Sequence, residues 1–245
     1  IYIGPINFQP SEVAKIAMIV FFAYSLSQNY KNLNHFAVFL IYIGIIGAVA
    51  GLIMLEPHFS CTMLIVSTLM VMLFVAGAKL SHFAILAVPA VLLVIVAVIK
   101  APYRMARVTT FLDPFKDIRG TGWQIVQSLY AIGSGGLFGV GMGQSRQKFM
   151  NIPEPQNDFI FSIYAEEFGL LGTILVIALF IFLIQRGIRI AMKAPDLFGT
   201  LLATGITTLI AIQTIVNIAV VTSSMPVTGM PLPFFSYGGT ALAIT

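Results

Sequence analysis

The sequence contains little charge and almost no cysteine. Charged residues make up 9% of its 245 residues, against about 25% in an average soluble domain, so a soluble fold is not expected. The one cysteine, Cys61, excludes an intrachain disulfide and a cysteine-rich metal site. The formal net charge is +4, but much of the positive charge lies in one polar segment, so no nucleic-acid partner is predicted.

Hydrophobic residues make up 58% of the chain and occur in long continuous runs. Because a helix needs about 20 apolar residues to cross a bilayer, the expected fold is an all-α polytopic membrane protein. We expect about six full transmembrane helices, and the start of a seventh near Tyr237. These helices are expected at roughly 12–27, 36–55, 59–76, 83–99, 159–184 and 197–221. We also expect residues 1–245 to form a single transmembrane domain, a fragment that lacks helices at both ends.

A long polar segment, 100–158, interrupts the apolar runs. The short loops elsewhere carry basic residues that fall on one side when the expected helices are counted through, and the positive-inside rule makes that side the cytoplasm. The long segment is then a large extracytoplasmic loop. Its own basic residues suggest that it holds an anion at the outer face, and a general attraction to lipid headgroups is the alternative. They are Lys100, Arg104, Arg107, Lys116, Arg119, Arg146 and Lys148.

Asp158 stands where this polar segment enters the next apolar run. Pro153 and Pro155 exclude a helix before that point, so Asn157 or Asp158 is expected to cap the helix that follows. Glu166 comes about 12 Å further along the helix axis, and an ionisable group at membrane depth is a functional candidate. A helical wheel also predicts one small or polar stripe, suited to close packing or to the wall of a wet cleft. The stripe comprises Asp158, Ser162, Ala165, Gly169 and Gly172.

Within the polar segment, residues 123–132 are predicted to form an amphipathic helix in the membrane interface. The glycine-rich stretch 133–143 follows it but lacks the GK[ST] of a P-loop. It is interpreted either as a flexible re-entrant loop or as a nest of backbone N–H groups that binds an anion. Arg146 and Lys148 come next. A cationic patch, a glycine loop and a carboxylate would therefore share one outer vestibule.

Glu12 and Lys15 are spaced i and i+3 in the first expected helix and can form an ion pair on one face. The pair is interpreted either as an interfacial ion pair or as a pair that faces a central cavity.

Several motifs together resemble the SEDS family of bacterial shape, elongation, division and sporulation proteins, which includes RodA, FtsW and SpoVE. The match extends over nearly the whole chain, and the 145–148 and 153–156 motifs favour FtsW or SpoVE over RodA. The family has ten transmembrane helices. The motifs are Phe8-Gln9-Pro10-Ser11-Glu12 with Lys15, Ala101-Pro102-Tyr103-Arg104, 124–148, 153–161, Glu166-Glu167-Phe168-Gly169 and 231–239.

The resemblance implies a peptidoglycan glycosyltransferase that polymerises lipid II at the outer face of the bacterial cytoplasmic membrane, alongside a class B penicillin-binding protein. Asp158 aligns with the family's essential aspartate and would act as the general base on the acceptor sugar. The plain alternative is that Asp158 only caps the helix. No metal ligands can be identified, although acids near a diphosphate could recruit Mg²⁺. The candidate substrate-binding residues are Glu12, Lys15, Arg104, Gln124, Arg146, Lys148 and Glu166.

One motif departs from the family. Where members usually have Pro-Asp-Leu-Gly-Thr, this chain has Pro57-His58-Phe59-Ser60-Cys61. The lost acid and glycine indicate a divergent paralogue. Two further functions stay open. The polar residues Glu12, Lys15 and Glu166 in apolar segments suggest a lipid II transporter, and the altered 57–61 motif suggests a non-catalytic scaffold for division or sporulation proteins.

Overall fold

The computed structural model describes residues 2–3, 6–7, 10–55, 59–116, 118, 120, 122–147 and 157–236. Parts of the motifs that carry the resemblance, and of the one that departs from the family, therefore lie outside the described residues. They are Phe8, Gln9, Pro57, His58, Lys148, 153–156 and 237–239. The expected helix start near Tyr237 also lies outside them.

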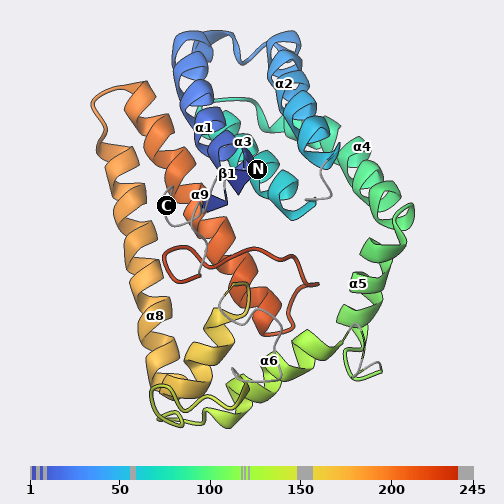
Figure 1. Cartoon of the computed structure of the whole chain (residues 1–245). Coiled ribbons are helices and arrows are strands. Elements are labelled where there is room, and N and C mark those ends of the chain that lie inside the picture. The colour runs from blue at the N-terminus through green and yellow to red at the C-terminus, as the bar shows by residue number, and fades with distance from the viewer. Residues whose placement is uncertain are drawn as a thin grey trace. The chain divides into compact units, whose positions relative to one another are not determined.

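The described chain is helical apart from the strands β1 (Tyr2–Ile3) and β2 (Ile6–Asn7), which pair antiparallel. Figure 1 labels the helices and colours them in chain order, from blue at the N-terminus to red at the C-terminus. They are α1 (Pro10–Asn29), the 3₁₀ turn η1 (Tyr30–Asn32), α2 (Phe36–Leu55), α3 (Phe59–Val75), α4 (Leu80–Ile99), α5 (Pro102–Leu112), α6 (Trp123–Ser134), α8 (Ile160–Lys193) and α9 (Leu197–Val221). The predicted all-α fold is confirmed.

A helix occurs at each of the six positions where a transmembrane helix was predicted. By length and composition, α2, α4, α8 and α9 are able to cross a membrane, and α3 is apolar but shorter. The exact number of membrane crossings stays a prediction.

The polar segment is not a continuous loop. The predicted amphipathic helix is present as α6, and a second helix, α5, begins at Pro102 and was not predicted. Proline at the first position of a helix is the sequence signal for α5, because its missing N–H would have no partner there in any case.

The chain divides into two compact units. The first comprises α1, α2, α3, most of α4, the C-terminal part of α8 and the N-terminal part of α9. Its core is built from aromatic and aliphatic side chains such as Phe22, Phe39 and Leu69. Ser25 and Tyr42 exchange a hydrogen bond of 2.9 Å that joins α1 to α2.

The second unit holds the end of α4, α5, α6, the N-terminal part of α8, and the end of α9 with the residues after it. Its core cluster includes Phe159, Phe161 and Leu232. Ser128 donates from α6 to the carbonyl of Val221 at the end of α9, over 2.8 Å. All the contacts around Asp158 described below lie in this unit.

Helix α8 is broken at Gly169, whose φ of 65° and ψ of −165° are not helical. In a regular helix, Leu170 N–H would donate to the carbonyl of Glu166. Leu171 N–H would donate to Glu167 in the same way. The break removes both hydrogen bonds, and buried backbone groups require replacement partners.

The replacement partners come from residues 135–143, which we call the glycine loop. Four hydrogen bonds join this loop to α8: Leu170 N–H to Gly136 O (2.9 Å), Leu171 N–H to Leu137 O (3.2 Å), Val140 N–H to Glu166 O (3.0 Å) and Gly141 N–H to Glu167 O (3.1 Å). Each donor and acceptor released by the break is thus paired with the loop. Since the N–H groups of Val140 and Gly141 are used in this way, they are not free to form an anion nest.

Glycines are required where the loop meets the helix. A Cβ at Gly135 would collide with the carbonyl of Ala165, and one at Gly139 would collide with the backbone of Glu167. Gly139 also has a φ of 80°, which L side chains rarely adopt. Ser162 and Ala165, both on the predicted small stripe, are buried. The stripe therefore serves close packing as far as Gly169. The helix is broken at Gly169, so the helical wheel does not predict which residues share a face beyond it.

Replacing Gly139 by alanine should destabilise the protein by about 1–3 kcal/mol from backbone strain alone, before the collision with Glu167 is counted. Gly133→Ala is the matched control, because Gly133 lies inside α6 and a Cβ there meets open space. Thermal unfolding of the detergent-solubilised variants measures the difference. Equal melting temperatures for the two variants would mean that the close approach of Gly139 to the backbone of Glu167 does not hold the glycine loop in place.

Candidate active site

Asp158 lies in the turn 157–159 that leads into α8 and is half-buried. The helix begins at Ile160, and the carbonyl of Phe159 accepts from Ser162 N–H, so the cap position is Phe159 and not the expected Asn157 or Asp158. Phe159 and Phe161 are buried in the core cluster and anchor the turn on either side of the helix start. The carboxylate of Asp158 faces the backbone at Gly229, where a Cβ would lie 3.3 Å from Oδ2.

Residues 225–236, which we call the proline loop, are tied to the Asp158 turn by side chains. Asn217 on α9 donates through Nδ2 to the carbonyls of Asp158 (2.8 Å) and Met230 (2.7 Å). Ser236 donates to the carbonyl of Asn157 over 2.6 Å and accepts from Leu232 N–H over 2.7 Å. The turn and the loop are therefore held together at two places.

Arg107 on α5 supplies positive charge beside this carboxylate. Its Nη1 donates to the carbonyl of Val227 in the proline loop over 2.8 Å, and its guanidinium lies 4.3 Å from the centre of the Tyr103 ring. Burial lowers the pKa of Arg107, and the charge of Asp158 raises it. An arginine remains charged despite such burial, so a cation and a carboxylate share this site.

Arg107 was counted among the basic residues of the polar segment but was not among the candidate binding residues. The missing information was α5, since without that helix the sequence did not show which basic residue faces Asp158. Asn217 was missed as well. A buried amide within an apolar run is the signal that could have identified it.

Glu166 is 1% exposed and binds the chain that follows the glycine loop. Its carboxylate accepts hydrogen bonds from Ser145 Oγ (2.5 Å), Arg146 N–H (3.1 Å) and Gln147 N–H (3.4 Å). The structure therefore brings two predicted site residues together, with Glu166 holding the backbone of Arg146 while the Arg146 side chain is exposed. In these contacts Glu166 holds a loop, which differs from the substrate contact expected for it.

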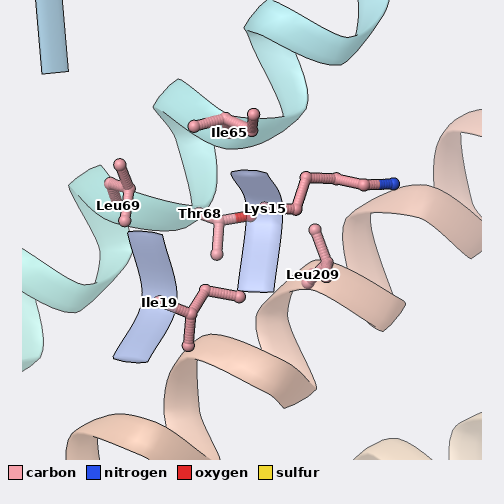
Figure 2. Close-up of a pocket in the computed structure, with 6 residues that line it drawn as sticks. All are labelled: Lys15, Ile19, Ile65, Thr68, Leu69 and Leu209. Atoms are coloured by element: carbon pink, nitrogen blue, oxygen red, sulfur yellow. The ribbon is translucent and has the colours of Figure 1, made fainter. Parts of the chain in front are cut away.

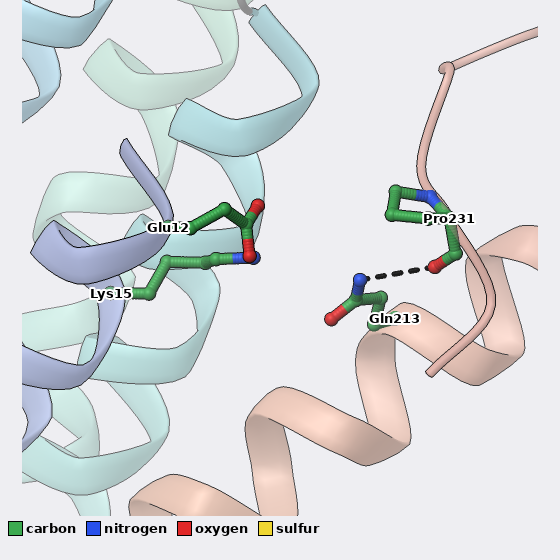
Figure 3. Close-up of polar contacts among 4 residues, drawn as sticks. All are labelled: Glu12, Lys15, Gln213 and Pro231. Atoms are coloured by element: carbon green, nitrogen blue, oxygen red, sulfur yellow. Dashed lines mark hydrogen bonds and ion pairs between the residues drawn. The ribbon is translucent and has the colours of Figure 1, made fainter. Parts of the chain in front are cut away.

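The predicted pair of Glu12 and Lys15 is present in the first unit, with Nζ and Oε2 separated by 2.6 Å (Figure 3). The two side chains are only 12% and 4% exposed. The stem of Lys15 lines a crevice with no room for a water molecule, and its ammonium extends away from Ile19 and Leu69 (Figure 2). The crevice is otherwise lined by Ile65, Thr68 and Leu209. The pair is thus buried beside apolar side chains.

The remaining candidate residues have separate positions. Arg104 lies on α5 and donates through Nη1 to the carbonyl of Ala97 near the end of α4, over 2.8 Å. Gln124 lies half-buried in the first turn of α6, and Lys148 lies outside the described residues. Among the described residues, no group of three or more His, Cys, Asp or Glu side chains could hold a metal ion. The Mg²⁺ expectation stays a prediction, because Asp117 and Glu154 are not described.

The chain has long apolar helices, a carboxylate in the turn that leads into one of them and an arginine from α5 beside that carboxylate. These features define a polytopic membrane protein with a polar site at a helix entrance. The sequence profile of the family described as "Cell cycle protein", comprising FtsW, RodA and SpoVE, matches residues 1–245. The chain belongs to this family.

Among its relatives, stage V sporulation protein E of Bacillus subtilis is 49% identical over 243 residues, which cover 99% of this chain and 66% of that protein. A probable peptidoglycan glycosyltransferase FtsW of Trichlorobacter lovleyi is 42% identical over 240 residues, covering 98% and 63%. The chain thus spans just under two thirds of the length of these relatives.

Two solved structures have the same fold. A chain from a peptidoglycan synthase complex, described for its coordination of polymerization and crosslinking, matches with a TM-score of 0.81 and 31% identity, over 100% of this chain and 68% of that one. The rod shape determining protein RodA of Thermus thermophilus matches with a TM-score of 0.64 and 26% identity, over 100% and 64%.

Replacing Arg107 by methionine should lower the stability of the protein by about 1.5–3 kcal/mol, the contribution typical of a hydrogen bond to a charged group. The change removes the bond to Val227 and the positive charge beside Asp158. Thermal unfolding measures the loss. Lys116→Met is the control, since Lys116 is exposed in the same polar segment, and it should change stability by less than about 0.5 kcal/mol. Indistinguishable melting curves would contradict the structural importance of Arg107.

Glu166→Gln should loosen residues 145–147, because a neutral amide accepts weaker hydrogen bonds than a carboxylate and its NH₂ group does not accept from an N–H. Hydrogen–deuterium exchange of a peptide covering these residues should become about tenfold faster, which corresponds to about 1.4 kcal/mol. Glu167→Gln is the neighbouring control and should leave this exchange unchanged. Unaltered exchange in Glu166→Gln would show that the carboxylate does not hold the loop.

Proposed function

We propose that the protein is a peptidoglycan glycosyltransferase that polymerises lipid II into glycan strands at the outer face of the cytoplasmic membrane. The observation that carries this proposal is the carboxylate of Asp158, half-buried beside Arg107 and facing the backbone at Gly229. A relative that is 42% identical is named a probable peptidoglycan glycosyltransferase. That name supports the same reaction class.

In the proposed reaction, Asp158 accepts the proton of the acceptor sugar's 4-hydroxyl as that oxygen attacks the anomeric carbon of the donor. The new glycosidic bond forms while the bond to the diphosphate breaks, and undecaprenyl diphosphate leaves with the electron pair. General-base catalysis typically contributes about 10²–10⁴-fold. Positioning of the two lipid-anchored substrates must supply much of the remaining acceleration.

Positive charge would stabilise the departing diphosphate. Arg146 suits this role because its side chain is exposed while its backbone is held by Glu166. Arg107 would act closer to Asp158, and Arg104 and Lys148 complete the proposed cationic set. Glu166 would then support substrate binding through the loop that it holds.

Glu12, Lys15 and Gln124 are also retained as proposed substrate-binding residues. The proposed partner is a class B penicillin-binding protein, which would cross-link the strands that this protein makes. The likeness to a chain of a peptidoglycan synthase complex supports that partnership. We further propose that residues 1–245 form one transmembrane domain whose segment 100–158 lies outside the membrane.

Asp158→Asn should abolish lipid II polymerisation by the purified full-length protein with its partner, because the amide no longer accepts the proton. Asp113→Asn, in the same polar segment at the end of α5, is the control and should retain activity. Glycan strands resolved by gel electrophoresis, at matched membrane abundance, provide the measurement.

Polymer at the wild-type level from Asp158→Asn would refute the proposed role. Lipid translocation into proteoliposomes that survived this substitution would instead favour the transporter, and full complementation of a mutant strain by Asp158→Asn would favour the scaffold.

A further inference from the structure

Asn217 lies four residues before the end of α9, a helix apolar enough to cross a membrane, and is 1% exposed. Burying an amide in such surroundings is costly unless its polar atoms are hydrogen-bonded. Both protons of Nδ2 are used, one on the carbonyl of Asp158 and one on the carbonyl of Met230, whereas the buried Oδ1 has no hydrogen-bond partner among the described residues. Because both partners are acceptors, only the NH₂ group of the amide can occupy this position.

The two carbonyls belong to the two segments that form the site. One is the main chain of Asp158 itself, and the other is next to Gly229, whose backbone faces the carboxylate of Asp158. A single planar NH₂ group therefore fixes the main chain of the acid relative to the backbone that the acid faces. Arg107 holds the same loop at Val227, so the placement of the loop also affects the cation beside the carboxylate.

We propose that Asn217 is a positioning residue for the reaction, which sets the place of the Asp158 carboxylate relative to the proline loop. It does so through two backbone carbonyls and without contacting substrate. This inference rests on the proposed function, in which Asp158 is the general base. A displacement of about 1 Å in such a group can reduce a rate by about 10²-fold.

Gln213 provides a matched comparison within the same helix. It lies one turn before Asn217 and is also buried, and its Nε2 donates to the carbonyl of Pro231 over 3.0 Å (Figure 3). This bond reaches the proline loop next to Met230 but does not include Asp158. A variant that lacks the Gln213 amide therefore measures the effect of weakening the attachment of the proline loop to α9, while the hydrogen bond from Asn217 to Asp158 is kept.

The experiment compares Asn217→Leu with Gln213→Met in the full-length protein with its partner. Both substitutions keep the approximate shape of the side chain and remove its amide. Asn217→Leu should lower kcat for lipid II polymerisation by about 10–100-fold with KM within about twofold. Gln213→Met should lower kcat by less than about threefold, although its melting temperature falls as well. Equal losses of kcat in the two variants would overturn the proposal.

A second measurement does not depend on catalysis. With Cys61 replaced by serine, an Asp158→Cys thiol reports on the turn through its rate of reaction with a water-soluble maleimide. Adding Asn217→Leu should change this rate by at least about fivefold, and adding Gln213→Met should not. An unchanged rate would refute the positioning role even if both variants had lost activity.

The two measurements distinguish failure of this inference from failure of the proposed function. If the wild-type protein made no polymer while the labelling rate still responded to Asn217→Leu alone, the proposed function would fail and the structural role of Asn217 would stand. Should Asn217→Leu fail to accumulate in the membrane, Asn217→Asp has the same shape with no amide protons and undergoes the same two measurements, with the same results expected.

Discussion

The second unit depends on an exchange of backbone hydrogen bonds at Gly169. A helix that enters a membrane satisfies its own N–H and C=O groups, and a break in it leaves polar groups that lipid does not satisfy. Here the glycine loop takes over both lost hydrogen bonds of α8, with one donor and one acceptor for each. The break is therefore the place where an irregular loop can be joined to a transmembrane helix without unpaired backbone groups.

This junction explains the position of Glu166. The residue comes three positions before Gly169, and its own carbonyl accepts from the glycine loop while its carboxylate accepts from Ser145 and the two residues that follow. The main chain of Glu166 thus binds the glycine loop, and its side chain binds the residues that directly follow this loop. The buried carboxyl group of Glu166 is hydrogen-bonded by these donors, and such bonds offset the cost of removing a polar group from water.

The surroundings of Asp158 follow the same principle of polar groups shared between segments. Asn217 and Ser236 join the turn of Asp158 to the proline loop, and Arg107 joins that loop to α5. The carboxylate therefore occupies a place defined by three separate parts of the chain. In the proposed glycosyltransferase, such fixed placement would keep the general base next to the acceptor sugar and the neighbouring cation next to the diphosphate.

The sequence by itself determined the helical membrane fold, the positions of the six long helices, the α6 helix, the Glu12–Lys15 pair and the place of Asp158 at the entrance of a long helix. Each depends on local information: the length of apolar runs, the i and i+3 spacing, and prolines next to an acid. Three contacts were decided by the tertiary structure alone. Arg107 lies beside Asp158, Glu166 binds residues 145–147, and Asn217 links the Asp158 turn to the proline loop. Those contacts join residues 20 to 120 positions apart, and the pattern of a single chain carries no signal for which distant polar groups satisfy one another.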